Sequence, residues 1–259
     1  MFLRALALSP IVFIAATLPG CGGGGGSSTP AVGTSSPAVQ AASVEGLYVG
    51  TTNSNRTVTG IVLGDGTYYV LYSPPGSSSL IAGVVQGTGT TNGNSFTSTD
   101  AKDFNLEGLG ILNASVSTSF AAKTNLNGSV SYPAQNQTVT FATTYDTDYD
   151  TTPAISTIAG TYSGQSAVVG GSENASVTIS STGAVSGRGN SGCTFTGQAT
   201  PRTHGSVYDL TVTFGSPPCA NANTTTNGIG YYRSSTKRLY GVGLNANRSN
   251  GFIYVGLKS

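Results

Sequence analysis

The chain has 259 residues, of which 37 are glycine, and only 8% are charged, against about 25% in an average soluble domain. Coiled coils and helical bundles need many long, straight side chains such as Glu, Lys, Arg and Leu, so this composition argues against both. A formal net charge of +1 leaves no basic surface for phosphate groups, which argues against nucleic acid as a partner.

The chain begins with a short apolar segment. One positive charge, Arg4, precedes a run of apolar residues that extends to Leu18 and is interrupted by Ser9-Pro10. A membrane-spanning helix needs about 20 apolar residues, and this run is shorter. The segment therefore predicts a signal peptide over residues 1–20.

The sequence Leu18-Pro19-Gly20-Cys21 follows and resembles the lipobox of bacterial lipoproteins, although proline is unusual at the second position. The resemblance implies that Cys21 receives diacylglycerol, becomes the first residue of the mature chain and is acylated, with palmitate for example, on its new amino group. Gly22, where retained lipoproteins carry Asp, implies transport to the outer membrane of a Gram-negative cell. The lipid bilayer is then the partner of acylated Cys21. The alternative is an ordinary signal peptide with a free thiol beside its cleavage site, an exposed and reactive arrangement.

Residues 21–43 predict a flexible tether. Glycines 22–26 are consecutive, and Ser, Thr, Pro and Ala follow them. Such a segment cannot bury a core.

From residue 44 onward, apolar residues alternate with polar ones in short runs bounded by Gly, Asn, Asp or Pro, the pattern of half-buried strands. Asp65-Gly66 between two such runs predicts a hairpin. The runs assigned to a first β-barrel-like domain over residues 44–145 are 44–50, 57–63, 67–73, 80–87, 95–105, 113–121, 126–132 and 137–145.

The acidic segment 146–157 is interpreted as a solvated linker. It contains Asp146, Asp148 and Asp150, whose alternation is the beginning of a Ca²⁺ loop. An EF-hand, however, next needs Gly at its sixth position and Glu at its twelfth, where this chain has Thr151 and Thr157. No metal is therefore assigned.

A second domain is predicted over residues 158–259. Residues 158–164 repeat the pattern apolar-x-Gly-x-Tyr-x-Gly of residues 44–50, either as an internal duplication or by coincidence. The predicted runs are 158–164, 174–180, 184–189, 193–199, 207–215, 227–233, 237–245 and 251–257.

Eight runs per copy match a small closed barrel, which leaves no unpaired strand edges. We therefore expect an all-β fold: two small antiparallel meander β-barrels, or sandwich-like domains, in tandem. The alternative is one transmembrane barrel of sixteen strands, which needs strands of about nine to eleven residues and aromatic girdles.

Gly160-Thr161-Tyr162, Val177-Thr178-Ile179, Gly183 and Val185-Ser186-Gly187 are similar to the first three strands of avidin-like and lipocalin-like barrels. Avidin-like biotin sites depend on Trp, and the chain has no Trp. The resemblance therefore predicts no biotin site here, and no other cofactor is predicted. Two tandem barrels behind a lipobox also resemble lipoproteins of the transferrin-binding-protein type. Fold similarity alone does not assign a function.

Cys193 and Cys219 are the two remaining cysteines of an exported chain, which predicts a disulfide; a redox or metal pair is the alternative. The bridge would join the open end of the hairpin formed by residues 193–199 and 207–215. Closing this loop would stabilise the folded chain by roughly 3 to 4 kcal/mol.

No residue is assigned a catalytic role. His204, the one histidine, lies in a predicted hairpin loop, and no Gly-x-Ser-x-Gly motif accompanies it. Acids such as Asp65, Asp100, Asp103 and Glu173 are interpreted as lone turn residues.

Four tyrosines lie beside charged residues and are either binding contacts or strand residues. They are Tyr145, Tyr149, Tyr231 and Tyr232, and the charges near the last two are Arg233, Lys237 and Arg238.

The sequence thus predicts an outer-membrane, lipid-anchored, non-enzymatic module that binds a protein or glycan partner through its barrel loops, or serves as a structural component. Carriage of a small apolar ligand inside one barrel is the alternative, and an enzyme is a further one.

Overall fold

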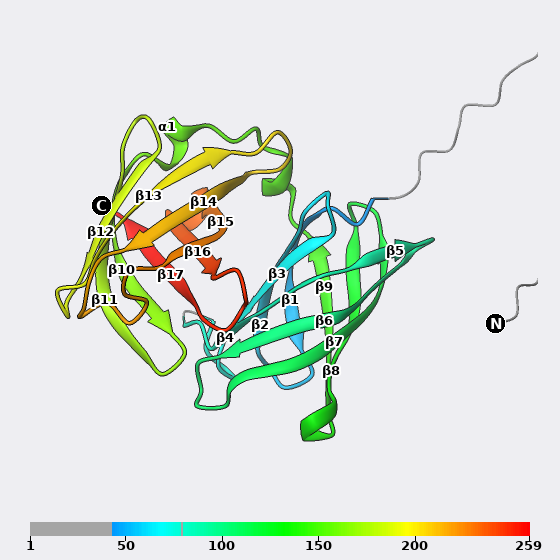
Figure 1. Ribbon diagram of the computed structural model, residues 1–259. Coiled ribbons are helices and arrows are strands. Elements are labelled where there is room, and N and C mark those ends of the chain that lie inside the picture. Colours follow the sequence, from blue (N-terminus) through cyan, green and yellow to red (C-terminus); the bar gives the residue numbers. More distant parts are fainter. Residues whose placement is uncertain (1–42, 79) are drawn as a thin grey trace, which may run out of the picture. The chain divides into compact units, whose positions relative to one another are not determined.

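The computed structural model describes residues 43–78 and 80–259. The predicted signal peptide, Cys21, and all of the predicted tether except residue 43 lie outside the described residues. The described part folds as two closed eight-stranded antiparallel β-barrels in tandem (Figure 1), which confirms the predicted fold class. No helix in this part is both long and apolar enough to span a bilayer.

The first barrel is a meander in which each strand pairs with its neighbour. Pairing of β1 with β9 and of β4 with β6 closes it, while β5 lengthens the hairpin with β6. Its strands are β1 (Gly46–Thr52), β2 (Thr57–Val62), β3 (Thr67–Tyr72), β4 (Gly83–Thr88), β5 (Thr90–Asn92), β6 (Ser95–Asn105), β7 (Gly110–Ala121), β8 (Asn125–Tyr132) and β9 (Gln137–Tyr145).

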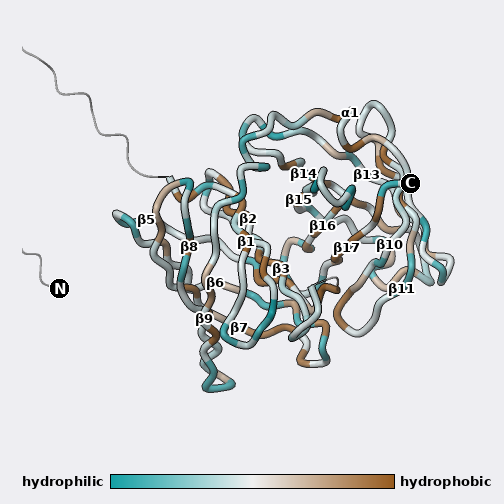
Figure 2. The backbone as a smooth tube through the Cα atoms, turned by 180° about the vertical axis from the view of Figure 1, so that it is seen from behind, coloured by the Kyte–Doolittle hydropathy of each residue, from teal (hydrophilic) through white to brown (hydrophobic). Residues whose placement is uncertain are grey.

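The second barrel is a simpler meander, closed by pairing of its first and last strands. Its strands are β10 (Gly160–Val168), β11 (Gly171–Ile179), β12 (Ala184–Gly189), β13 (Thr194–Pro201), β14 (Val207–Phe214), β15 (Thr225–Arg233), β16 (Arg238–Leu244) and β17 (Gly251–Lys258). Apolar and polar residues alternate along many of these strands (Figure 2), because one face points into a barrel.

Every predicted run overlaps a strand, but four elements differ from the prediction. β10 and β11 are longer than expected and turn at Gly170, whose φ of +101° suits glycine. β5 lies between the predicted runs 80–87 and 95–105 and was not predicted. A short helix, α1 (Ile155–Ile158), lies in the segment that was predicted to be a linker.

The interior of the first barrel is packed with aromatic rings around a buried acid. Asp103, interpreted from the sequence as a turn residue, instead lies in β6 and is 3% exposed. Its carboxylate accepts hydrogen bonds from the hydroxyls of Tyr72 at 2.8 Å and Tyr132 at 2.9 Å. Burial raises the pKa of Asp103 to about 6.

A third apolar cluster joins the two barrels through their outer faces. It consists of Leu47, Ile61, Leu63, Tyr69, Leu71, Val84 and Phe104 from the first barrel, with Tyr149, Val207, Ile229, Tyr231, Val242, Leu244 and Ile253. β3 is therefore buried on both faces, which explains its almost unbroken apolar sequence. Polar contacts flank the cluster: Arg248 donates to the carboxylate of Asp100 at 3.0 Å and to the carbonyl oxygen of Gln86 at 2.6 Å.

The segment between the barrels is not free in solvent. Asp146 forms an ion pair with Arg233 at 2.7 Å. Tyr149, in the 3₁₀ turn η2 (Thr147–Asp150), is buried, and its hydroxyl donates to Glu45 at 2.8 Å. The sequence could not show this, because each partner is distant along the chain.

Candidate functional site

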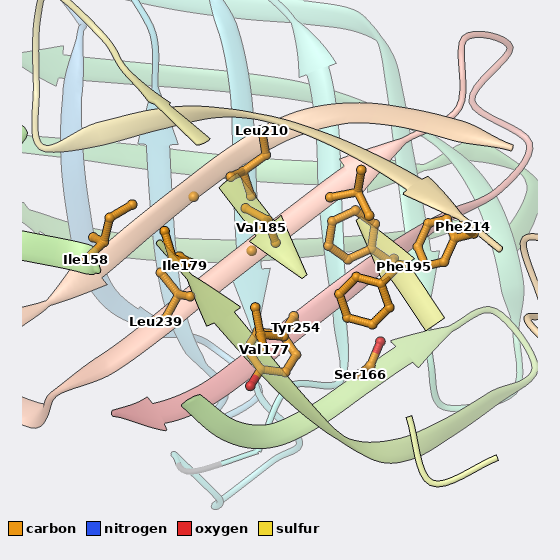
Figure 3. A pocket seen from close by; sticks show the side chains of 14 residues that line it. Ile158, Ser166, Val177, Ile179, Val185, Phe195, Leu210, Phe214, Leu239 and Tyr254 are labelled. Atoms are coloured by element: carbon orange, nitrogen blue, oxygen red, sulfur yellow. The ribbon is translucent and has the colours of Figure 1, made fainter. Parts of the chain in front are cut away.

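The second barrel encloses a small apolar cavity of about 40 Å³. Inward-facing residues of successive strands line it, and Figure 3 shows their side chains converging. They are Ile158, Ser166, Val177, Ile179, Val185, Phe195, Leu210, Val212, Phe214, Gly230, Leu239, Gly241, Phe252 and Tyr254. A cavity with this lining is suited to an apolar group and not to water, which needs polar partners.

One end of the barrel is closed by α1. Ile158 is 1% exposed and lines the cavity at the end opposite Phe214 in Figure 3. Its carbonyl oxygen accepts a hydrogen bond from the hydroxyl of Tyr162 at 2.6 Å. The hydroxyl of Tyr208 donates to the carbonyl oxygen of Ala154, directly before the helix, at 2.9 Å. These bonds hold α1 as a plug.

The other end opens into a larger pocket of about 340 Å³, which we call the mouth. The mouth is lined by Ser166, Val168, Val169, Gly170, Gly171, Ser172, Glu173, Ala175, Ser191, Cys193, Phe195, Phe214, Pro218, Ala220 and Asn221. Ser166, Phe195 and Phe214 line both the mouth and the inner cavity. The centroids of the two rings are 5.8 Å apart, so the rings are in contact and form a closed neck between the two spaces. The second barrel is therefore a cup with an apolar floor.

Glycines create the space inside the cup. A methyl group at Gly241 would lie 3.5 Å from Leu210, an ordinary contact, so the site is open there. At Gly187 the same methyl would lie 2.2 Å from the ring of Phe195, which occupies that space instead. At some glycines of the inner wall, a neighbouring aromatic ring fills the space that a side chain would occupy. At others that space stays open and adds to the cavity.

The disulfide expected between Cys193 and Cys219 is present, with the two Cα atoms 4.5 Å apart. It joins the start of β13 to the loop after β14, at the open end of that hairpin, and Cys193 lines the mouth. The bond therefore fixes the loop that forms one side of the opening.

Each of the clustered aspartates has a different partner. Besides the Asp146 ion pair, Asp148 accepts a hydrogen bond from Tyr231 at 3.4 Å, and Asp150 forms an ion pair with Lys123 at 2.6 Å. The Lys123 hydrogen bond lowers the pKa of Asp150. The described residues contain no group of three or more potential His, Cys, Asp or Glu metal ligands.

The tyrosines considered as binding contacts are mostly structural. Tyr149 and Tyr231 are buried in the cluster between the barrels, Tyr145 packs on Tyr48, and Tyr232 packs on Tyr162. His204 is exposed in the loop between β13 and β14, as the sequence predicted.

A groove beside the barrels carries exposed leucines. Leu80 and Leu257, which are 53% and 49% exposed, line a pocket of about 160 Å³. Leu109, 63% exposed, stands between two glycines that line a neighbouring pocket of about 420 Å³. These are the large apolar side chains that the described chain presents to solvent.

No protein-family model matches the chain, and no curated protein matches it. Similar solved structures include a candidate outer membrane protein of Bacteroides fragilis, with 17% identity over 84% of this chain and 98% of that chain and a TM-score of 0.26. Transferrin binding protein B (isotype 1) of serogroup B Neisseria meningitidis has 10% identity, coverages of 79% and 66%, and a TM-score of 0.29. A protein of unknown function from Nostoc punctiforme has 11% identity, coverages of 83% and 94%, and a TM-score of 0.29. Likeness at these TM-scores carries no argument about function.

Proposed function

We propose that this chain is a lipid-anchored, non-enzymatic binding module of the bacterial cell envelope, and that it holds a small apolar molecule in the second barrel. The observation that carries this proposal is the cup: an apolar cavity, closed by α1 and reached through the mouth. Ligand sites are typically apolar and concave with a few polar groups, which this arrangement matches.

Two of the loops predicted to meet a partner are engaged within the chain itself. The loop before β14 contacts the segment between the barrels through a hydrogen bond from Ser206 to Tyr149. The loop before β17 places Arg248 against the first barrel. The cup is therefore favoured over these loops as the binding site.

Binding to a protein or glycan remains a second candidate function. The exposed leucines 80, 109 and 257 favour it, because such residues grouped beside pockets are typical of docking surfaces.

The ligand proposal is tested by native and denaturing mass spectrometry of the chain purified from cell membranes. A carrier shows a defined mass in the native spectrum that is lost on denaturation, and Gly241→Ala lowers its occupancy. A native mass equal to the denatured mass in both proteins would count against carriage.

The anchor is tested separately by Cys21→Ser. We expect the wild-type chain in the membrane fraction and labelled by palmitate, and the variant unlabelled and released from the membrane. A variant that stays labelled in the membrane fraction would contradict the lipid assignment.

A further inference from the structure

We infer that the second barrel binds an amphiphile with a slender apolar tail and a positively charged head. This inference rests on the proposal that the cup is a ligand site. The neck, the two volumes and the charge at the mouth together define this class of ligand.

The shape of the cup requires a slender tail. The inner cavity of about 40 Å³ is far smaller than the mouth of about 340 Å³. Phe195 and Phe214 separate the two spaces, and Phe214 also packs against Phe252 at 5.7 Å. The two rings touch, so any tail that reaches Ile158 must turn them aside. A straight alkyl chain needs the smallest displacement of the rings, whereas a broad ring system needs a much larger one.

The mouth carries one acidic side chain and no basic one among the residues that line it. Glu173 stands on the inward side of β11, in alternation with the buried residues Ala175 and Val177. Its sequence neighbours had instead indicated a turn. Its position on the rim brings its charge to the opening of the apolar cavity.

Glu173 is held in place by hydrogen bonds and not by a cation. Its carboxylate accepts from the backbone N–H of Ser191 at 2.7 Å and from the Ser191 hydroxyl at 3.1 Å. Within residues 43–78 and 80–259 it has no ion-pair partner. Its negative charge is thus available to a ligand at the mouth, where it attracts an ammonium group and repels a carboxylate.

The inference is tested with probes that share one tail. Full-length protein is titrated calorimetrically at pH 7 and low salt with n-octylammonium, n-octanol and n-octanoate, each below its micellar concentration. We expect octylammonium to bind tightest and octanoate to bind about tenfold more weakly, the ratio set by one partly exposed charge that attracts one head and repels the other.

Variants assign the effect to the two parts of the cup. Glu173→Gln keeps one acceptor oxygen for the Ser191 N–H, can donate its amide N–H to the Ser191 hydroxyl, and should remove the difference between the charged probes. Asp65→Asn, which changes an exposed acid of the first barrel, should preserve it. Gly241→Ala, which fits the wall without a clash, should weaken all probes.

The outcomes separate the two proposals. If no probe binds, or if Gly241→Ala has no effect on binding, both the carrier function and this inference are overturned. If all probes bind equally, or if Glu173→Gln leaves their order unchanged, the inference about the head group is overturned while carriage stands.

Discussion

Asp103 shows how a single side chain makes the first barrel sensitive to pH. The pKa of this carboxyl is about 6 in the folded chain, against an ordinary value of 3.8. Between these values the folded chain keeps a proton that the unfolded chain releases. The free energy of unfolding therefore decreases as pH rises through this window, and Asp103 costs about 3 kcal/mol above it.

Asp103→Asn removes this term. We expect the variant to gain stability relative to the wild type as pH rises from about 4 to about 6, and the two to change in parallel outside that range. Urea unfolding followed by tyrosine fluorescence measures the difference. Asp65→Asn serves as the exposed control, and parallel curves for Asp103→Asn across the whole range would show that the acid is not buried as described.

At the scale of elements, α1 sets the depth of the cavity inside the second barrel. Of its four residues, only Ile158 is buried and lines the cavity, where it closes the end of the cup. Such a short helix has no stability of its own, so its position depends on the bonds to Tyr162 and Tyr208 and on the packing of Ile158.

Ile158→Ala should cost about 2 to 5 kcal/mol of stability, as for other large-to-small core substitutions. It should also deepen the cavity, so that n-decylammonium gains affinity relative to n-octylammonium. Titration of both probes into both proteins measures this shift. A loss of stability with no change in the preferred chain length would mean that the tail does not reach α1.

At the scale of the whole molecule, the cluster between the barrels makes them one cooperative unit. Leu47 and Val207 are fully buried there, one from each barrel. Each barrel would expose this apolar face if its partner unfolded, so we expect the unfolding of one barrel to destabilise the other.

We therefore expect one thermal transition by calorimetry for the wild-type chain. Val207→Asp places an unpaired charge in the cluster and should divide the transition in two or lower its midpoint sharply. Thr211→Asp, on the same strand and face but exposed, should do neither. Two separate transitions in the wild type would contradict this view.

The strands and their closure into two barrels could be predicted from the sequence, because period-two alternation and turn residues are local signals. The position of Asp103 could not, since its partners Tyr72 and Tyr132 lie 31 and 29 residues away. The almost unbroken apolar run of β3 indicated that both faces of this strand are buried. It did not show that the second barrel covers the outer face.

The mouth was missed for a related reason. Ser166 and Glu173 fall where β10 and β11 extend beyond their predicted ends, so their inward direction was not visible. α1 is too short to produce a helical period. The disulfide was predictable because cysteine pairing in exported chains needs only a count.

The glycines of the second barrel make its specificity easy to evolve. At Gly164, Gly197 and Gly228 a methyl group would lie about 2 Å from the backbone of the next strand, so these positions are fixed by the fold. At Gly230 and Gly241 it would meet side chains and no backbone: Leu210 comes nearest, at 3.3 and 3.5 Å, and at Gly241 Phe252 and Tyr254 follow at 3.7 and 3.8 Å. Mutations at these two positions can shorten or reshape the cavity one carbon at a time while the barrel stays intact. The ligand preference that we propose for the cup can therefore change without loss of the fold.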